Sequence, residues 1–379
     1  MPGTTDREFN VYGLGNALLD LQVHAAEADL EALGIEKGGM TLVDTGQRQQ
    51  ILDHFGEATL HRASGGSVAN TVITVSQLGG FAAFSGLLGD DAHGRHYREE
   101  MEAVGIEVRT ATVPRGATGT SVILITPDAE RTMTTTLGVS ADFGPANVSE
   151  DVMRRSEWLY IEGYLFSTDS GRAAVRRAIE LAKAHDVKVA LTFSDAFVVR
   201  EFGQALKEAV ADAELVFANH VEAKEYTGKE DEDEVFRELR RVAPNVIMTL
   251  HERGARASFC DTEYFFEPFK VQPVDVTGAG DTFAGGLLYG ITNDHTVAEA
   301  GRLASFLASR VVAQLGPRLQ ADVRELVKEL QSTSPPPHSR EARTSRRGPP
   351  ARVQRHPAFR RVAYRQLPGR GPQLGEDAG

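Results

Sequence analysis

The sequence predicts an α/β fold in which a doubly wound, mostly parallel sheet carries helices on both faces. Between Glu157 and Leu250, short apolar runs alternate with segments of helical periodicity, and this alternation is typical of parallel sheets. A hydrophobic content of 41% and a charged content of 25% are sufficient for a large buried core. The strands predicted here are Trp158–Ile161, Val187–Thr192, Leu215–Ala218 and Val246–Leu250, with helices at Ser170–His185, Glu201–Ala211, from about Val221, Val297–Gln314 and Asp322–Leu330.

Length and composition exclude several classes of protein. A chain of 379 residues allows one large domain or two ordinary ones. Its one cysteine, Cys260, cannot form a disulfide within the chain, which fits a reducing cytoplasm. No apolar run approaches the length of a membrane span, and the first residues lack the apolar core of a signal peptide. We therefore expect a cytoplasmic protein without a membrane partner.

The composition changes abruptly at Gln331. The segment from there to Gly379 contains ten Arg, three acidic residues and eight of the sixteen prolines, and it has no apolar periodicity. We expect a disordered Pro/Arg-rich tail over 331–379, or a C-terminus altered by a frameshift. The preceding part has 31 basic and 50 acidic residues, a net charge of −19, which argues against general nucleic-acid binding. A basic tail that binds nucleic acid is the alternative.

The first predicted strand brings two polar side chains to its carboxyl end. Val11–Asp20 is predicted to be a strand that runs into a turn, with Asn16 and Asp20 at its end. A carboxylate accepts two hydrogen bonds, so Asp20 suits a ligand with a diol. The Gly-Leu-Gly of this strand does not complete a dinucleotide-binding fingerprint, because Leu18 replaces the third glycine. The alternative is that Asp20 is a surface residue of the turn.

A second candidate ligand site consists of residues at the start of a predicted helix, namely Gly65, Gly66, Ser67 and Asn70. Two adjacent glycines let a ligand approach the backbone closely, and Asn70 could add an amide contact one turn into the helix. An ordinary turn is the alternative. Around this stretch the sequence predicts a strand at Met40–Val43, a helix at Thr45–Phe55 capped by Asp44 or Thr45, and a buried strand at Ala82–Leu87.

A predicted hairpin and two later strand ends carry further candidates. Thr120–Thr126 and Glu130–Thr136 pair in the hairpin, from which Arg131 could reach a phosphate or substrate, or lie on the surface. Asn219 and Glu222 at a helix start could hold a hydrated magnesium ion, with a capping box as the alternative. Ligands bind beyond the carboxyl ends of parallel strands. Two more cofactor-binding candidates at such positions are Thr249 and Gly254.

The stretch from Val274 to Phe283 carries the strongest chemical signal. An apolar approach leads into Gly278, Ala279 and Gly280, followed by Asp281. A helix that begins at about Gly278 would direct free N–H groups and the positive end of its dipole toward an anion. Asp281 in the first turn could accept a proton from an attacking hydroxyl, so the stretch predicts phosphoryl transfer to an alcohol. The alternative is a Gly-rich turn with an acid at the helix start.

Together these motifs resemble the ribokinase-type (PfkB) carbohydrate kinase family over roughly Val11 to Leu330. Val274–Phe283 is similar to the C-terminal signature of that family and Gly65–Asn70 to its N-terminal signature, with Asn219-x-x-Glu222 between them. Nothing in the chain matches a P-loop, which agrees with a family that binds ATP without one. The resemblance implies a ribokinase-like kinase domain over residues 9–330, with a small β-sheet lid from about 21–43 and 108–136.

The resemblance also implies ATP, Mg²⁺ and roles for individual residues. Asp281 would be the general base, with the backbone of Gly278–Asp281 as the anion hole. Arg131 would come down with the lid, and Asn219 and Glu222 would organise Mg²⁺ and phosphate. The residues that could form a monovalent-cation site for K⁺ are Asp275 and Thr277. The candidate substrate-binding residues are Asn16, Asp20, Gly65, Gly66, Ser67, Asn70, Arg131 and Phe166.

Within the family, Gly15–Asp20 and Arg131–Met133 are most similar to adenosine-kinase-type members. Glu162–Phe166 is similar to the stretch that lines the base pocket there, so Phe166 could stack on a purine; core packing is the alternative. The predicted function is ATP-dependent phosphorylation of a primary hydroxyl of an adenosine-like nucleoside or a sugar. The alternatives are a ribokinase- or fructokinase-like sugar kinase and a non-catalytic sugar- or nucleotide-binding regulator. We expect a small-molecule substrate and ATP as partners, and a monomer or homodimer.

Overall fold

The computed structural model describes residues 7–56, 61–128 and 130–332. Its main element is a nine-stranded sheet that is parallel from β7 to β14 and antiparallel at β15 and β16. The predicted doubly wound, mostly parallel sheet is thereby confirmed. In spatial order the strands are β16 (Thr262–Phe266), β15 (Ala255–Phe259), β14 (Asn245–Thr249), β13 (Leu215–Asn219), β12 (Lys188–Thr192), β11 (Ser156–Glu162), β1 (Phe9–Leu14), β5 (Ala82–Ser85) and β7 (Glu107–Val108).

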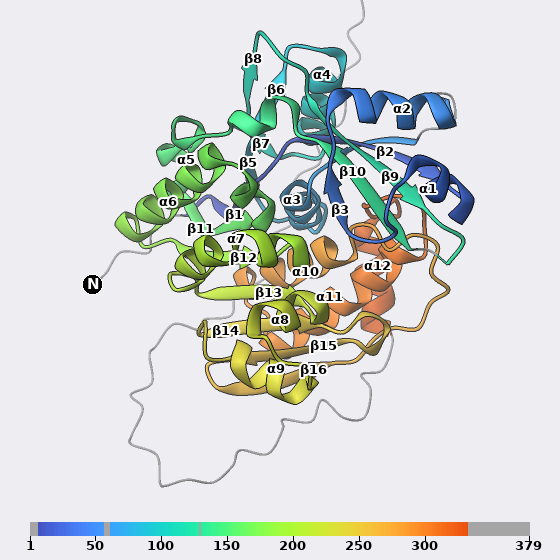
Figure 1. Cartoon of the computed structure of the whole chain (residues 1–379). Coiled ribbons are helices and arrows are strands. Elements are labelled where there is room, and N and C mark those ends of the chain that lie inside the picture. Colours follow the sequence, from blue (N-terminus) through green and yellow to red (C-terminus); the bar gives the residue numbers. More distant parts are fainter. Residues whose placement is uncertain (1–6, 57–60, 129, 333–379) are drawn as a thin grey trace, which may run out of the picture. The chain divides into compact units, whose positions relative to one another are not determined.

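Helices cover both faces of this sheet (Figure 1). Side chains of a strand alternate between the two faces: on β11, Leu159 and Ile161 pack into one core, and Trp158 and Tyr160 into the other. The helices of the first core are α5 (Glu150–Arg154), α6 (Asp169–Ala184), α7 (Ala196–Val210), α8 (His220–Thr227) and α9 (Glu232–Leu239). Those of the second are α3 (Ser67–Gln77), α4 (Ala92–Ala103), α10 (Ala279–Thr292) and α11 (Val297–Val312), against which α12 (Val323–Ser332) packs.

The strand order reverses between β1 and β11. From β1 the chain proceeds to β5 and β7 on one side, and then returns to β11 and continues to β14 on the other. In open α/β sheets, the crevice beyond the carboxyl ends of two such strands is the usual ligand site. Asn16 follows β1 and Glu162 ends β11, so both residues lie at this crevice.

A second sheet of five strands, called the small sheet below, lies outside the nine-stranded sheet. In spatial order its strands are β3 (Met40–Leu42), β10 (Arg131–Thr136), β9 (Gly119–Ile125), β2 (Leu18–His24) and β4 (His61–Gly65). One of its faces is covered by α1 (Glu27–Leu33) and α2 (Thr45–Phe55), which pack on Leu19, Leu21 and Val122 (Figure 1). The alternation along β2 turns Asp20 to the opposite face.

The boundaries expected for the lid need correction. Strand β4 belongs to the small sheet although it lies outside both expected ranges, and β2 begins at Leu18. Residues 107–113 lie elsewhere, because β7 pairs with β5 and β8 (Ala111–Val113) pairs with β6 (Leu87–Gly89). The predicted strand Val11–Asp20 is two strands, since Gly15–Ala17 lead the chain from one sheet to the other. The expected tail begins inside α12; its residues 333–379 lie outside the described part.

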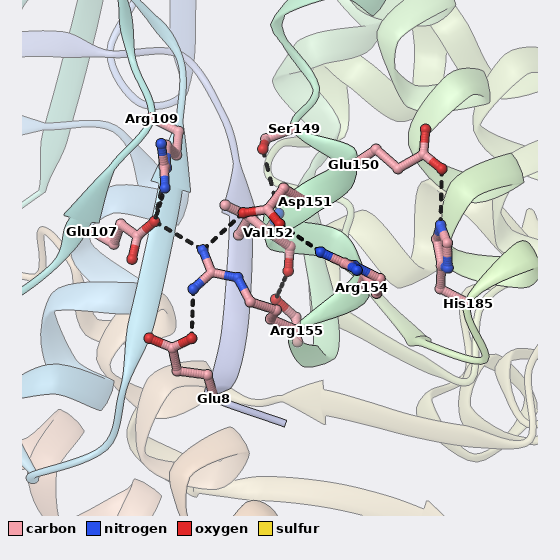
Figure 2. Close-up of polar contacts among 11 residues, drawn as sticks. Glu8, Glu107, Arg109, Ser149, Glu150, Asp151, Val152, Arg154, Arg155 and His185 are labelled. Atoms are coloured by element: carbon pink, nitrogen blue, oxygen red, sulfur yellow. Dashed lines mark hydrogen bonds and ion pairs between the residues drawn. The ribbon is translucent and has the colours of Figure 1, made fainter. Parts of the chain in front are cut away.

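A cluster of ion pairs ties together the amino ends of the central strands (Figure 2). The Arg155 guanidinium lies 3.1 Å from carboxylate oxygens of both Glu107 and Asp151, and it also pairs with Glu8. Arg155 precedes β11 and Glu8 precedes β1, so the cluster lies at the opposite end of these strands from the crevice.

Among the helices of residues 7–56, 61–128 and 130–332, none combines the length and the apolar character that a membrane span requires.

Candidate active site

At the start of α10, Gly278 has no room for a side chain, whereas Gly280 borders open space. Gly278 has φ +76°, and a Cβ there would lie 2.3 Å from the carbonyl oxygen of Pro317. At Gly280 a Cβ would meet none of the described atoms within 4 Å, so the first turn is open on that side. Because α10 begins at Ala279, its N-terminal end faces this open space. The positive end of the helix dipole favours an anion there.

Asp281 projects from the first turn of α10 toward the N-terminus of α3. Ser67 Oγ donates a hydrogen bond to Asp281 Oδ1 at 2.6 Å, and Asn70 Nδ2 donates to Oδ2 at 3.0 Å. Burial raises the pKa of Asp281 above its usual range, while the two hydrogen bonds and the Arg131 cation oppose the shift. The carboxylate is therefore oriented by two donors and moved toward the pKa of a base that works near neutrality.

Asp20 lies on the inner face of the small sheet and is 4% exposed. Its carboxylate is packed against Gly65, where a Cβ would lie 2.0 Å from Asp20 Oδ1. Burial raises the pKa of Asp20 to about 7, although the Arg318 and Arg131 cations counteract this shift. Only glycine at position 65 leaves room for this carboxylate.

Glu162 is a buried carboxylate that the sequence analysis did not single out as a site residue. Its Oε1 accepts hydrogen bonds from the backbone N and the Nδ2 of Asn16 at 2.8 and 2.9 Å, and its Oε2 accepts one from Val68 N at 3.1 Å. The side chain is 1% exposed, and burial raises its pKa to about 7. Glu162 therefore joins the turn after β1 to the first turn of α3. Its position at the end of a predicted parallel strand was the signal that could have identified it.

One pocket is lined by six of the eight predicted substrate-binding residues and by Asp281, whereas Gly65, Phe166, Gly278, Ala279 and Gly280 do not line it. Its polar side includes Asn16, Asp20, Gly66, Ser67, Asn70, Arg131, Glu162, Thr277 and Asp281. Its apolar lining, called the apolar wall below, consists of Leu18, Met40, Ile123, Met133 and Leu137, with Ser121 and Thr135 on the same strands as Ile123 and Met133. Four of the five members of this wall come from strands of the small sheet, whose alternation turns them inward.

Tyr164, and not Phe166, lines this pocket. Residues Gly163–Ser167 form a 3₁₀ helix, in which side chains three positions apart lie on one face. Tyr164 and Ser167 accordingly face the pocket, and Tyr164 Oη donates to the carbonyl oxygen of Ser194 at 3.2 Å. Phe166 is 2% exposed and packs into the core beneath α6 and α7, which corrects its expected role in the base pocket.

Arg131 lies at the pocket edge of β10. Its Nη1 lies 3.8 Å from the sulfur of Met133. Within the described ranges, no Asp or Glu lies within ion-pair distance of its guanidinium. The cation is thus available to an anionic group of a ligand.

The candidates for the metal and cofactor form a separate group at the ends of β13 and β14. Asn219 Nδ2 donates to Glu222 Oε1 at 2.6 Å, Asn219 N donates to Oε2 at 2.9 Å, and Glu222 N donates back to Asn219 Oδ1. This is the capping box that the sequence left as the alternative. Burial, together with the negative charge of Asp195, raises the pKa of Glu222 to about 7. Thr249 pairs with Asn219 in the sheet, and Gly254, at φ +95°, follows β14; neither lines the pocket.

Asp275 organises the loop that precedes α10. Its Oδ1 accepts a hydrogen bond from Thr277 N at 2.8 Å, and its Oδ2 accepts one from Gly316 N at 2.9 Å. Thr277 Oγ1 is buried without a hydrogen-bond partner in the described part of the chain. The described residues contain no group of three or more His, Cys, Asp or Glu side chains suited to hold a metal ion.

This arrangement suits phosphoryl transfer to an alcohol, because the oriented Asp281 carboxylate faces a pocket at the reversal point of a parallel sheet and projects from a helix N-terminus that favours an anion. The family model described as "pfkB family carbohydrate kinase" matches residues 40–324, and the chain belongs to that family. It is an ATP-dependent kinase with an alcohol group as the acceptor. The predicted ribokinase-like fold is confirmed as well.

Individual relatives carry different substrate names. The chain is 28% identical over 348 residues to a 5-dehydro-2-deoxygluconokinase from Halalkalibacterium halodurans, a match that covers 87% of this chain and 95% of the relative. A probable sugar kinase from Rhizobium etli is similar in structure, with a TM-score of 0.83, 30% identity and coverage of 86% and 99% of the two chains. Adenosine kinase from Sinorhizobium meliloti has a TM-score of 0.82, 32% identity and coverage of 85% and 99%.

Proposed function

We propose that this kinase phosphorylates the primary hydroxyl of a nucleoside, with adenosine or a close analogue as the acceptor. The observation that carries the proposal is an apolar row beside the polar groups of the pocket: Met40, Met133 and Ile123 are direct neighbours across three strands of the small sheet. A free sugar presents hydroxyls in every direction and would leave several of them against Leu18, Ile123 and Met133 without partners. A nucleoside has a polar ribose and a flat base, and it matches both sides. The likeness to a bacterial adenosine kinase at 32% identity also supports this proposal.

The polar side provides the groups that a ribose requires. Asp20 can accept two hydrogen bonds from a vicinal diol. Asn70 Oδ1 is buried and has no hydrogen-bond partner in the described part of the chain, so it offers an acceptor for another hydroxyl. Glu162 orients Asn16, whose amide also borders the pocket. Met40 and Met133 are neighbours in the small sheet, and their thioethers provide an adaptable surface for an aromatic base.

In the proposed reaction, Asp281 takes the proton of the acceptor hydroxyl as its oxygen becomes bonded to phosphorus, with ADP as the leaving group. The open first turn of α10, from Gly278 to Asp281, fits the transferring phosphoryl group, because its amides and helix dipole stabilise negative charge. ATP supplies the phosphoryl group and Mg²⁺ neutralises its charge when both are bound.

The residues present fit Mg²⁺ only as an ion held largely by the nucleotide and water. Glu222 is engaged in its capping box through both carboxylate oxygens, so it would act on the ion through water. We further propose that Thr249 and Gly254 belong to the nucleotide side of the site, since they end and follow β14 beside Asn219. A K⁺ ion near Asp275 and Thr277 stays a prediction from the family resemblance.

A sugar-acid kinase is the second candidate, and Arg131 favours it. This cation borders the pocket, and no described carboxylate pairs with it. The carboxylate of a sugar acid would form a charge-assisted pair there. The relative named 5-dehydro-2-deoxygluconokinase, matched over 95% of its length, is consistent with this alternative.

The test is an ADP-release assay with ATP and a panel of acceptors: adenosine, inosine, guanosine, cytidine, ribose, fructose and 5-dehydro-2-deoxygluconate. We expect adenosine to have the highest kcat/KM. Replacing Met133 with Ala in the apolar wall should raise KM for adenosine about tenfold and leave KM for ribose unchanged. Met153→Ala, in the core under α5, is the control for a general loss of stability. Adenosine turnover no better than that of ribose would refute the nucleoside proposal, and preference for the acid would favour the second candidate.

A further inference from the structure

The loop between α11 and α12 contacts the phosphate side of the site. Gly316 N donates to Asp275 Oδ2 at 2.9 Å. The next residue, Pro317, lies against Gly278, where a Cβ would come within 2.3 Å of the Pro317 carbonyl oxygen. Residues 316 and 317 therefore help to hold the turn from which α10 begins.

Arg318 extends from the same loop in the other direction and reaches β4 of the small sheet. Its guanidinium donates to the carbonyl oxygen and the hydroxyl of Ser64, and it lies 3.5 Å from Glu100 Oε2. The same carboxylate accepts a hydrogen bond from Ser64 N at 2.7 Å. Ser64 is fully buried and the Arg318 side chain is 16% exposed. An anion and a cation thus hold the backbone N–H and the carbonyl oxygen of one residue of β4.

The peptide held by Arg318 leads directly into the glycines on the substrate side. Gly65 follows Ser64 and packs against the Asp20 carboxylate, and its carbonyl oxygen accepts a hydrogen bond from Tyr97 Oη at 3.2 Å. The next residue, Gly66, is the N-cap of α3 at φ +97° and lies against the carbonyl oxygen of Asn16. Displacement of Ser64 would therefore move the backbone that borders both Asp20 and Asn16.

We propose that Arg318 is a positioning residue that fixes the Gly65–Gly66 backbone, and Asp20 with it, relative to the Gly278–Asp281 turn. The distance between these two glycine segments sets how far the acceptor hydroxyl lies from the transferring phosphoryl group. Because a misplacement of about 1 Å can cost roughly 10²-fold in rate, a rigid link between them matters for catalysis. The proposal rests on the proposed role of Asp20 in acceptor binding, but it does not depend on which acceptor is bound.

Arg318 has a second, electrostatic effect on Asp20. Its cation lowers the pKa of this carboxyl, which burial raises to about 7. The other charged or titratable groups that face Asp20 are Arg131 on β10, Asp281 on α10, Asp275 before α10 and Tyr97 on α4. The ionised carboxylate can accept a hydrogen bond from a diol on each of its oxygens, whereas protonation turns one of these oxygens into a donor. Loss of Arg318 should therefore move the acidic limb of kcat/KM to higher pH, by about one unit.

The experiment compares Arg318→Met and Arg318→Lys in the full chain, using whichever acceptor the wild type turns over best. Phosphorylated acceptor and ADP are quantified separately, and kcat/KM is measured against pH. For Arg318→Met we expect a loss of about 10² in kcat/KM, more than one ADP released per product because water competes with a misplaced hydroxyl, and the shifted acidic limb. Arg318→Lys keeps the charge but not the planar fork, so it should restore the limb while the excess of ADP persists.

Arg155→Met serves as the matched control, because Arg155 is also partly buried and holds three carboxylates, but at the opposite end of the strands (Figure 2). It should lower the unfolding temperature without altering the ADP-to-product ratio or the limb. An ADP-to-product ratio of one and an unshifted acidic limb of kcat/KM in Arg318→Met would show that Arg318 has only a structural role, and would overturn the proposal. If Arg318→Met does not fold, wild-type kcat/KM with a ratio of one in Arg318→Lys overturns it. A wild type that rejects nucleosides refutes only the proposed function.

Discussion

Replacing Asp281 with Asn removes a proton acceptor while leaving its shape nearly unchanged. The wild-type carboxylate receives one hydrogen bond from Ser67 Oγ at 2.6 Å and one from Asn70 Nδ2 at 3.0 Å. An asparagine can keep both contacts, because its carbonyl oxygen accepts from Asn70 and its NH₂ group donates to Ser67. A serine hydroxyl serves as donor or acceptor, so only its proton has to rotate. The variant should therefore fold and bind its acceptor as the wild type does.

The expected loss lies in the chemical step. General-base catalysis contributes roughly 10²–10⁴ in rate, and each tenfold loss corresponds to about 1.4 kcal/mol in the barrier. Asp281→Asn should thus raise the activation free energy of the chemical step by about 3–5 kcal/mol, which lowers kcat and leaves KM for the acceptor nearly unchanged. The raised pKa of Asp281 also predicts an acidic limb in the wild-type kcat profile, since the protonated carboxyl cannot act as a base.

The assay is coupled ADP release at saturating ATP and acceptor, with acceptor affinity measured separately by calorimetry. The matched control is Asp151→Asn, the same substitution at an exposed aspartate in the Arg155 cluster (Figure 2). It should leave kcat and acceptor affinity at wild-type values. If Asp281→Asn retains kcat within a fewfold of wild type, the assignment of the base is incorrect. If it loses acceptor binding instead, Asp281 holds substrate and another group takes the proton.

Three other predictions follow from the same contacts. Gly278→Ala adds a Cβ at φ +76° and 2.3 Å from the Pro317 carbonyl oxygen. Backbone strain alone costs about 1–2 kcal/mol, and the displaced turn should reduce kcat more than tenfold. Wild-type turnover in this variant would contradict the anion-hole role of the turn. Phe166→Ala should lower the free energy of unfolding by about 3–5 kcal/mol without raising KM, whereas Tyr164→Ala should raise KM for a nucleoside. Equal effects on KM in the two variants would contradict the assignment of Tyr164, rather than Phe166, to the pocket. The third concerns the buried carboxyls with pKa raised to about 7, which are Asp20, Glu162 and Glu222. Their folded pKa values exceed the unfolded values of 3.8–4.5, so the free energy of unfolding without ligands should fall as pH rises from about 4 to 7. Urea titrations across that range test the direction, and Glu222→Gln should flatten the slope.

Much of the fold is readable from local patterns. The strands from Trp158 to Leu250 are continuous apolar runs, because both faces of a parallel sheet are buried, and the helices between them show clear periodicity. Local patterns do not record which sheet a strand joins. Val11–Asp20 looked like one strand because Gly15–Ala17 differ little from their neighbours, yet β1 and β2 pair in different sheets. Strand β4, His61–Gly65, is short and polar at its start, and pairing with β2 makes it a strand.

The candidate site divides in a similar way. Asp281, Asn70 and Asp20 belong to motifs in which a glycine or a strand end lies beside the polar residue, so the chemistry required there was visible in sequence. The choice between Tyr164 and Phe166 depended on the 3₁₀ turn, which aims one aromatic at the pocket and the other at the core. The spacing of Asn219 and Glu222 fitted both a magnesium site and a capping box, and only the structure shows that the capping box forms.

The sequence by itself indicated the family and the turn that we propose binds phosphate, because the glycines and the acid are adjacent in the chain around Gly278–Asp281. The tertiary structure alone decided how the acceptor side is assembled. Glu162, Ser64 and Arg318 come from a strand end, an edge strand and a loop near the end of α11, and no periodicity links positions 64, 162 and 318. Folding brings Glu162 to Asn16 because the sheet reverses between β1 and β11, and it brings Arg318 to Ser64 because the loop after α11 reaches β4 of the small sheet. Buried carboxylates and cations at that reversal then require partners from distant parts of the chain.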